Sequence, residues 1–308
     1  MIHNRPVSNR FANLTRVQAL DPDRDYHDIY QQMVRVEFPF DLKLGLNLGF
    51  NRSFSTPAVA RVLAGTGELT ERTQKRRDDT GILMYELVIN GLDHPRSREA
   101  IRRINQIHRP YRGLPAEEYL YVLACCAVIP LRWLDRYAWR KPCCHERQAT
   151  FRFYAELGRL MNVTGIPDDL AALETWFDTY DAENLKPNEA AVAIEKATRS
   201  LLLGKLPRPL VPLGDAMLSA LYDDRLRAAT GLREPAWPVR AAVHTLLRAR
   251  AGFLRHFGRP RAVPRFPDGR LTTSTYPDGY EIQDLGPKPK DDDDLVRRSG
   301  GQEGGGPE

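Results

Sequence analysis

Two short stretches of the sequence place polar side chains on apolar helix faces. Ile101, Ile104, Asn105 and His108 follow the i, i+3, i+4, i+7 spacing that aligns side chains on one stripe of a helix. Because the stripe carries bulky apolar residues, we expect it to face inward and His108 to be buried. A lone inward histidine is most often a hydrogen-bonded core residue, but its imidazole is also a ligand for iron cofactors.

The second stretch lies 28 residues earlier, measured from Thr80 to His108. Arg76 and Thr80 are one helical turn apart, on a stripe that Leu83 and Leu87 continue. A guanidinium and a hydroxyl in apolar surroundings need polar partners. Two polar clusters on neighbouring inward faces therefore predict a lined cavity, and an inward imidazole would allow that cavity to hold an iron cofactor.

The composition is that of a globular domain. The chain has 308 residues, of which 42% are hydrophobic and 28% charged, and its net charge of +5 arises from 45 basic and 40 acidic residues spread along the chain. So small an excess predicts no nucleic-acid partner. The oligomeric state stays open.

No segment of the sequence is long and apolar enough to serve as a membrane span or an N-terminal signal. The longest apolar run, residues 119–131, is shorter than the roughly 20 residues that cross a bilayer. We therefore expect a buried core helix there, no transmembrane segment and a cytoplasmic location. A peripheral contact with a membrane stays open.

The pattern of helix starts and stops, with almost no alternating strand pattern, predicts an all-α fold. We expect an N-terminal extension over residues 1–24, followed by a single multi-helix domain over 25–258 that encloses a buried cofactor pocket. Pro130, Pro142 and Pro167 are expected to divide their stretch into three helical pieces, because proline breaks helices. The expected helices cover about residues 26–38, 57–65, 71–91, 95–109, 119–129, 189–204, 215–230 and 238–257.

The segment from 259 to 308 is rich in Pro, Gly and Asp, so it is expected to build no core and to be largely disordered. The acidic run Asp291 to Asp294 lacks the glycine and the spaced ligands of an EF-hand loop, and it is interpreted as a solvated charge block. Residues 285–308 in particular are expected to be disordered.

The cysteines occur as two adjacent pairs, Cys125-Cys126 and Cys143-Cys144. Adjacent cysteines seldom bridge because the geometry is strained, so reduced thiols are expected. His145 follows the second pair, but the spacing of structural zinc sites is missing. Nearby, Trp139, Arg140 and Glu146 form either a second feature of the site or an ion pair that joins two helices at Pro142. The structural interpretation is preferred.

Five motifs occur in a fixed order along the first half of the chain. They are Glu37-Phe38-Pro39, Thr66-Gly67-Glu68-Leu69, Lys75-Arg76-Arg77-Asp78-Asp79-Thr80, Asn105-Gln106-Ile107-His108, and Trp139-Arg140 followed by Glu146-Arg147. With these motifs, residues 37–161 resemble the MpaB-type oxygenase family, which is related to the catalytic domain of latex-clearing rubber oxygenases.

The resemblance implies an all-α protein that binds haem b, with His108 as the proximal iron ligand and Asn105 orienting it. It further implies that Arg76 pairs with a haem propionate or polarises bound dioxygen, and that Thr80 hydrogen-bonds in the distal pocket. The rubber-cleaving members have a lysine where this chain has Asp79. Whether the chain cleaves rubber therefore stays open, and Asp79 either changes the distal pocket or pairs with Arg76 or Arg77.

The resemblance thus implies a haem b-dependent oxygenase that uses dioxygen or peroxide, and we expect it to act on an apolar, unsaturated, isoprenoid-like small molecule. The alternative is a non-catalytic helical protein that binds a lipid-like ligand in the same cavity. Only the first hypothesis requires a coloured protein.

Overall fold

The computed structural model describes residues 10–111, 113–259, 261, 264–265 and 272–287. Within these residues the chain forms helices and no strands, which confirms the predicted all-α class. The helices are α1 Ala12–Gln18, α2 Tyr26–Gln32, α3 Pro39–Ser53, α4 Pro57–Thr66, α5 Glu68–Glu71, α6 Thr73–Asn90, α7 Pro95–His108, α8 Ala116–Tyr137, α9 Cys144–Leu160, α10 Leu170–Asn184, α11 Glu189–Leu203, α12 Val211–Ser219, α13 Asp224–Thr230 and α14 Trp237–Phe257. A π-helical segment, Met33–Glu37, joins α2 to α3.

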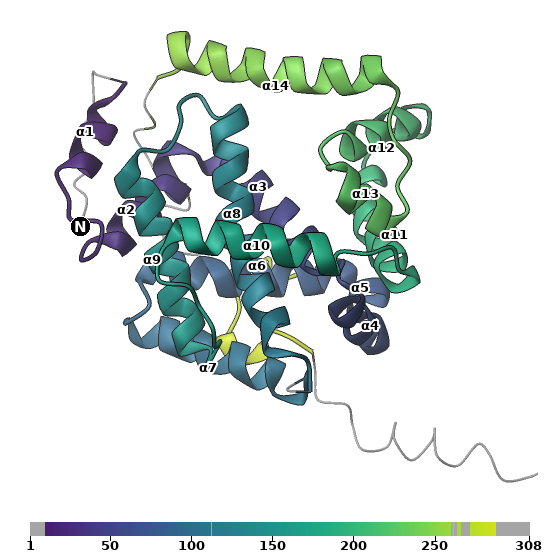
Figure 1. The fold of residues 1–308 in the computed structure, drawn as a ribbon, viewed down its shortest axis with the longest axis horizontal. Coiled ribbons are helices and arrows are strands. Elements are labelled where there is room, and N and C mark those ends of the chain that lie inside the picture. The colour runs from purple at the N-terminus through teal and green to yellow at the C-terminus, as the bar shows by residue number, and fades with distance from the viewer. Residues whose placement is uncertain (1–9, 112, 260, 262–263, 266–271, 288–308) are drawn as a thin grey trace, which may run out of the picture.

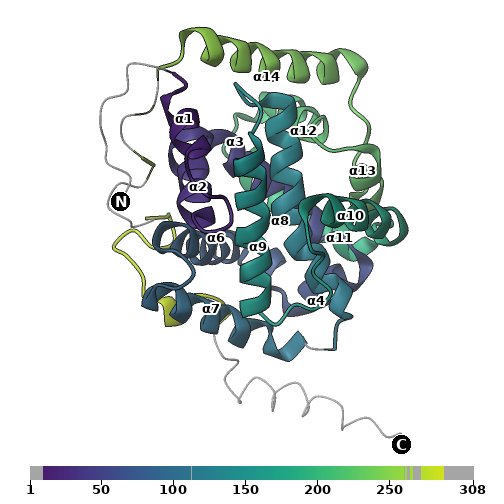
Figure 2. The same cartoon turned by 60° about the vertical axis from the view of Figure 1, so that its left-hand side comes forward.

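Helix α8 is the centre of the fold, with α3, α9 and α10 packed around it (Figures 1 and 2). Its apolar residues are buried on nearly every side, as expected for a helix surrounded by others. Three tyrosines, Tyr30, Tyr121 and Tyr154, are among the largest fully buried side chains. Helices α6 and α7 lie at one end of this core, and α14 crosses the opposite end.

Pro130 does not end a helix, so that prediction is wrong: α8 continues through Pro130 to Tyr137. A proline in a helix interior costs about 3 kcal/mol, and the burial of Leu131 and Leu134 beyond it offsets that cost. The proline also faces Gly45 of α3, where a Cβ atom would lie 2.7 Å from Pro130 Cα. Close contact with α3 therefore favours a continuous α8.

Two other helix boundaries differ from the sequence prediction. Pro39 ends the first predicted helix and also begins the next, since α3 starts at Pro39. The helix predicted over 215–230 is two helices, because Asp223 caps α13 and accepts a hydrogen bond from Leu226 N at 2.9 Å. The predicted breaks at Pro142 and Pro167 agree with the gaps before α9 and α10.

Both ends of the described chain contribute to the main core. Val17 of α1 is 1% exposed, and Ile282 and Leu285 have no exposed surface. The prediction that the segment after residue 258 builds no core is therefore wrong for 272–287. Burial of two large aliphatic side chains, at about 1.5–3 kcal/mol each, explains why this polar segment is held in place. The acidic run at 291–294 lies outside the described residues.

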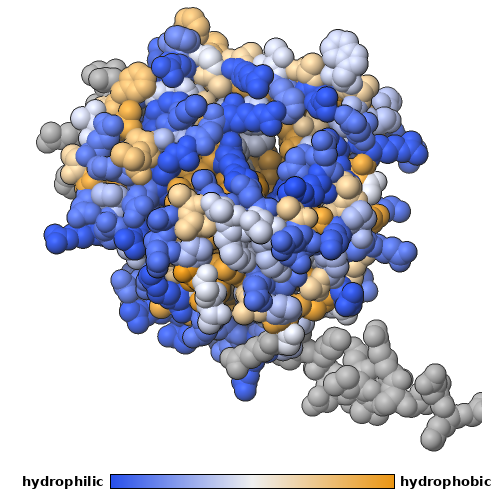
Figure 3. All heavy atoms as spheres, in the orientation of Figure 1, coloured by the Kyte–Doolittle hydropathy of each residue, from blue (hydrophilic) through white to orange (hydrophobic). Residues whose placement is uncertain are grey.

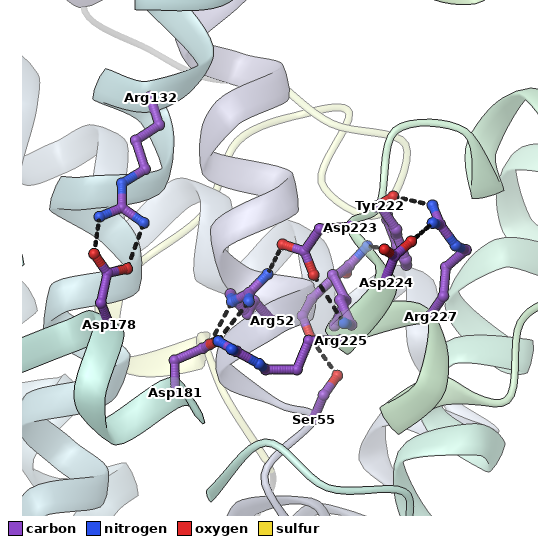
Figure 4. A network of polar contacts seen from close by, with 12 residues as sticks. Arg52, Ser55, Arg132, Asp178, Asp181, Tyr222, Asp223, Asp224, Arg225 and Arg227 are labelled. Carbon is purple, nitrogen blue, oxygen red and sulfur yellow. Dashed lines mark hydrogen bonds and ion pairs between the residues drawn. The ribbon is translucent and has the colours of Figure 1, made fainter. Parts of the chain in front are cut away.

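A buried ionic network ties α3 to α10 and α13 (Figure 4). Arg52 donates to both carboxylate oxygens of Asp181, at 2.5 and 2.7 Å, and to Asp223 at 2.6 Å. Tyr121 and Arg225 donate to the same Asp181 at 2.6 and 2.7 Å. These donors and the positive charges lower the pKa of Asp181 even though burial opposes that shift. Through Arg52 and Tyr121 the network holds α3 and α8 together, and both of these helices border the cavity described below.

On the face shown in Figure 3, hydrophilic residues cover most of the surface and apolar residues lie between them. None of the described helices combines the length and the hydrophobicity needed to cross a bilayer.

Candidate active site

A cavity of about 180 Å³ lies between α3, α4, α6, α7, α8 and α9. Its walls are mostly apolar. Aromatic and aliphatic side chains from all six helices line it, among them Phe50, Phe54, Val59, Leu63, Leu83, Met84, Ile107, Val122, Leu157 and Met161. A few polar groups, chiefly Arg76, Thr80, His108, Glu68 and Glu118, interrupt this lining. An apolar cavity with a few converging polar groups is the usual form of a small-molecule site.

His108 is the last residue of α7 and borders the cavity. The centroid of its ring lies 6.3 Å from the ring centroid of Tyr119. Burial, and secondly the positive charge of Arg76, lower the pKa of His108 from 6.5 to about 4. The imidazole is therefore neutral at pH 7. No described residue forms a hydrogen bond with either of its ring nitrogens. The prediction that His108 faces inward agrees with its place on the cavity wall, although its side chain is half-buried and not fully buried as expected.

Arg76 and Thr80 face the same cavity from α6. The Arg76 guanidinium donates to Thr80 Oγ1, and that hydroxyl donates in turn to the Arg76 carbonyl at 2.9 Å. Among the described residues no carboxylate forms an ion pair with Arg76. Burial lowers the pKa of Arg76, while the negative charges of Asp79 and Glu68 act in the opposite direction. A half-buried cation without an ion-pair partner is suited to binding an anionic group of a ligand.

Asn105 does not line the cavity. Its side-chain amide donates to the carbonyl of Leu160 at 3.0 Å and so joins α7 to the last turn of α9. The structure therefore brings Arg76, Thr80 and His108 together and leaves Asn105 behind them. Asn105 supports the packing of the helix that carries His108, but among the described residues it forms no hydrogen bond with the imidazole itself.

Asp79 is buried, with 1% exposure, and it also does not line the cavity. It accepts hydrogen bonds from Lys75 at 2.8 Å and from the hydroxyl of Tyr276 at 2.6 Å. Of the two alternatives left open for Asp79, pairing with Arg76 or Arg77 is not what the structure has, because the i, i+4 spacing places Lys75 beside it on the helix. Tyr276, which is distant in sequence, is the second residue that donates a hydrogen bond to the Asp79 carboxylate.

Sequence reasoning missed Glu118, whose carboxyl borders the cavity and is 5% exposed. The Thr56 hydroxyl donates to it at 2.8 Å, and Tyr180 also hydrogen-bonds to it. Burial raises the pKa of Glu118 despite these two donors. A helical stripe gave the available signal: Glu118, Val122 and Cys126 are spaced four residues apart, and all three line the cavity.

Residues 44–256 match the family described as "ER-bound oxygenase mpaB/B'/Rubber oxygenase, catalytic domain". The chain belongs to this family. The predicted relationship is thereby confirmed, and the matched region contains Arg76, Thr80 and His108.

Curated relatives of the mpaB family extend the comparison. The chain is 27% identical over 294 residues to ER-bound oxygenase mpaB' of Penicillium brevicompactum, covering 90% of this chain and 66% of the relative. It is 27% identical over 224 residues to ER-bound oxygenase mpaB of Penicillium roqueforti, covering 67% and 75%. For mpaB of P. brevicompactum the identity is 26% over 205 residues, covering 61% and 52%. The chain thus spans about half to three quarters of these proteins.

Two of the five family-like motifs meet away from the cavity. Arg140 donates to Glu37 at 2.9 Å and to both carboxylate oxygens of Glu146 at 2.7 Å, and all three residues are buried or nearly so. Trp139 donates to the Glu37 carbonyl at 3.3 Å. The ion pair joins the segment before α3 to the start of α9. This geometry agrees with the structural interpretation of Trp139, Arg140 and Glu146.

The Cys143-Cys144-His145 segment begins α9. The Glu146 carboxylate accepts a hydrogen bond from Cys143 N at 2.9 Å, and a ring nitrogen of His145 lies 3.2 Å from the carbonyl oxygen of Val17. These contacts occupy the segment in helix capping and packing. All four cysteines are free thiols.

Proposed function

We propose that this chain is a haem b-dependent oxygenase that inserts oxygen from dioxygen, or from peroxide, at an unsaturated bond of an apolar, isoprenoid-like molecule. The observation that carries the proposal is the neutral His108 imidazole beside the Arg76 guanidinium, at the wall of an apolar cavity. A family whose members bear the name oxygenase supports the reaction class.

The residues present fit haem b in kind. His108 would offer a neutral imidazole to hold the iron, and Arg76 would offer a cation for a propionate or another anionic group. The apolar side chains suit the faces of a macrocycle. The cavity is smaller than most ligand sites, which measure about 300–1,000 Å³. To admit haem b, flexible side chains in its wall, such as Met84 and Met161, would have to move outward.

When bound, haem would supply the iron at which dioxygen or peroxide is activated. The chain's own residues would supply the surroundings. His108 would hold the cofactor, and Arg76 would place a positive charge near the reacting oxygen atoms. Thr80 would fix the Arg76 guanidinium through its hydroxyl. The aromatic and aliphatic walls would exclude water and orient an apolar substrate.

A direct test is to reconstitute the purified protein with haemin, supply squalene as an unsaturated isoprenoid probe under ¹⁸O₂, and analyse the products by mass spectrometry. We expect ¹⁸O-labelled products from the wild type and none from His108→Ala. His244→Ala is the matched control, because His244 lies on α14 against Tyr137 and not at the cavity. Unchanged activity in His108→Ala would refute the assignment of His108.

The second candidate function, storage of a lipid-like ligand without catalysis, is favoured by the predominantly apolar lining. Native mass spectrometry of the purified protein separates the two. A bound lipid, together with failure to take up added haemin, would favour the binding protein.

A further inference from the structure

The segment that follows the family-matched region returns to the cavity. We call residues 272–287 the C-terminal strap. In Figures 1 and 2 it is the yellow stretch beside α7. The family match ends at residue 256, so the strap lies outside it.

Three hydroxyl groups of the strap donate to three acidic side chains of α6. The distances are 2.5 or 2.6 Å in each case, and the pairs are Thr275 with Asp78, Tyr276 with Asp79, and Tyr280 with Glu86. Asp79 and Glu86 are buried, with 1% and 2% exposure. Two of the acids also accept from basic side chains, Asp79 from Lys75 and Glu86 from Arg96. Charge-assisted bonds to buried carboxylates fix the strap along α6.

The end of the strap is held just as closely. Arg103 of α7 donates to the Leu285 carbonyl at 2.7 Å, and Lys75 donates to the Gly286 carbonyl at 3.0 Å. Gly286 has a φ of +94°, and a Cβ atom there would lie 2.5 Å from Ile107 Cδ1. Only glycine fits this close approach to α7 without strain. The chain therefore reaches the cavity on a defined path.

Pro287, the next residue, lines the cavity together with Ile107 and His108. Ile282 and Leu285, which precede Pro287 in the strap, have no exposed surface and anchor the strap to the core. We propose that the C-terminal strap is a wall of the active site, that Pro287 limits the size of the ligands the cavity accepts, and that Asp79 is a positioning residue that holds this wall through Tyr276. The inference rests on the proposed function only in taking the cavity as the substrate site.

This role accounts for the aspartate at position 79. An acid there can bind both the Lys75 ammonium and the Tyr276 hydroxyl, whereas a lysine could not accept either bond. The position thus supports the wall of the cavity, and does not itself contact a ligand.

The size limit can be tested on the metal-free protein with the fluorescent probe N-phenyl-1-naphthylamine, displaced by linear alcohols from hexanol to hexadecanol. Pro287→Trp should weaken displacement by the longest alcohols by about tenfold or more, and leave hexanol within about twofold. Pro277→Trp is the matched control, because Pro277 is an exposed proline of the same strap that does not line the cavity. A Pro287→Trp protein with the wild-type Tm and wild-type alcohol affinities would overturn the proposal.

The positioning role has a separate readout. Tyr276→Phe keeps the ring and removes only the hydroxyl that Asp79 binds, so amide hydrogen exchange at residues 281–286 should become faster and long-alcohol binding should change. Ser274→Ala, at an exposed strap residue, should change neither. Faster exchange with unchanged alcohol binding would reduce the strap to a structural element and refute its part in the site. Neither experiment needs haem or turnover, so a failure of the oxygenase proposal leaves both interpretable.

Discussion

Acidification of the metal-free protein should destabilise it through His108. Burial and the charge of Arg76 hold the pKa of this imidazole at about 4, against an ordinary 6.5. Between these pH values the unfolded chain binds a proton that the folded protein does not. Stability therefore rises with pH in this window: the contribution is complete above pH 6.5 and is lost as the pH falls toward 4. At 1.36 kcal/mol for each pH unit, the whole window is worth about 3 kcal/mol.

The assay is urea unfolding of wild type and His108→Gln at a series of pH values from 7 to 4. The variant has no imidazole at this position, so wild type should lose about 3 kcal/mol more unfolding free energy than the variant across the series. Titration of histidine ring signals by NMR gives the pKa directly. Replacing Arg76 by methionine should raise that pKa, because it removes the nearby positive charge. A His108 that titrates near 6.5, with parallel stability curves for wild type and variant, would refute the reasoning.

Two further predictions concern stability. Arg52→Met should cost about 3–5 kcal/mol in denaturant unfolding, because it leaves the buried carboxylate of Asp181 in α10 with fewer donors (Figure 4). Arg132→Met removes the exposed ion pair between α8 and Asp178 of α10, and should cost less than about 1 kcal/mol. Equal costs would contradict this reasoning. Gly49→Ala should lower Tm, because the added Cβ would lie 2.6 Å from a backbone oxygen of α8. The Cβ of Gly81→Ala, in α6, would meet nothing within 4 Å, so this variant should be more stable by about 0.5–1 kcal/mol. A stabilised Gly49→Ala protein would show that α3 and α8 are not in close contact.

The part of the site that lies on two local helices could be predicted from the sequence. Arg76 and Thr80 follow from the i, i+4 spacing, and His108 from the apolar stripe of its own helix, so periodicity placed all three on inward faces. That the two faces border one cavity was also expected. Periodicity alone favoured a core histidine, and only the resemblance to the family favoured the hypothesis that His108 binds a ligand.

The parts that could not be predicted depend on contacts between distant segments. Pro130 ends a helix by local rules, but packing against Gly45 overrides them. Nothing near Asp79 in sequence indicates Tyr276, which is 197 residues away. The sequence of the strap is mostly polar, and only a few of its side chains, such as Ile282, are buried. Whether so few apolar side chains become buried depends on the surface of the helices against which they pack, which the local sequence does not specify.

The most direct test of the central claim is the absorption spectrum of the purified protein, expressed with sufficient iron and haem precursor, before and after dithionite. We expect a Soret band that shifts on reduction and is lost or strongly altered in His108→Ala. A colourless protein that also fails to bind added haemin, or a Soret band unchanged in His108→Ala, would contradict this claim.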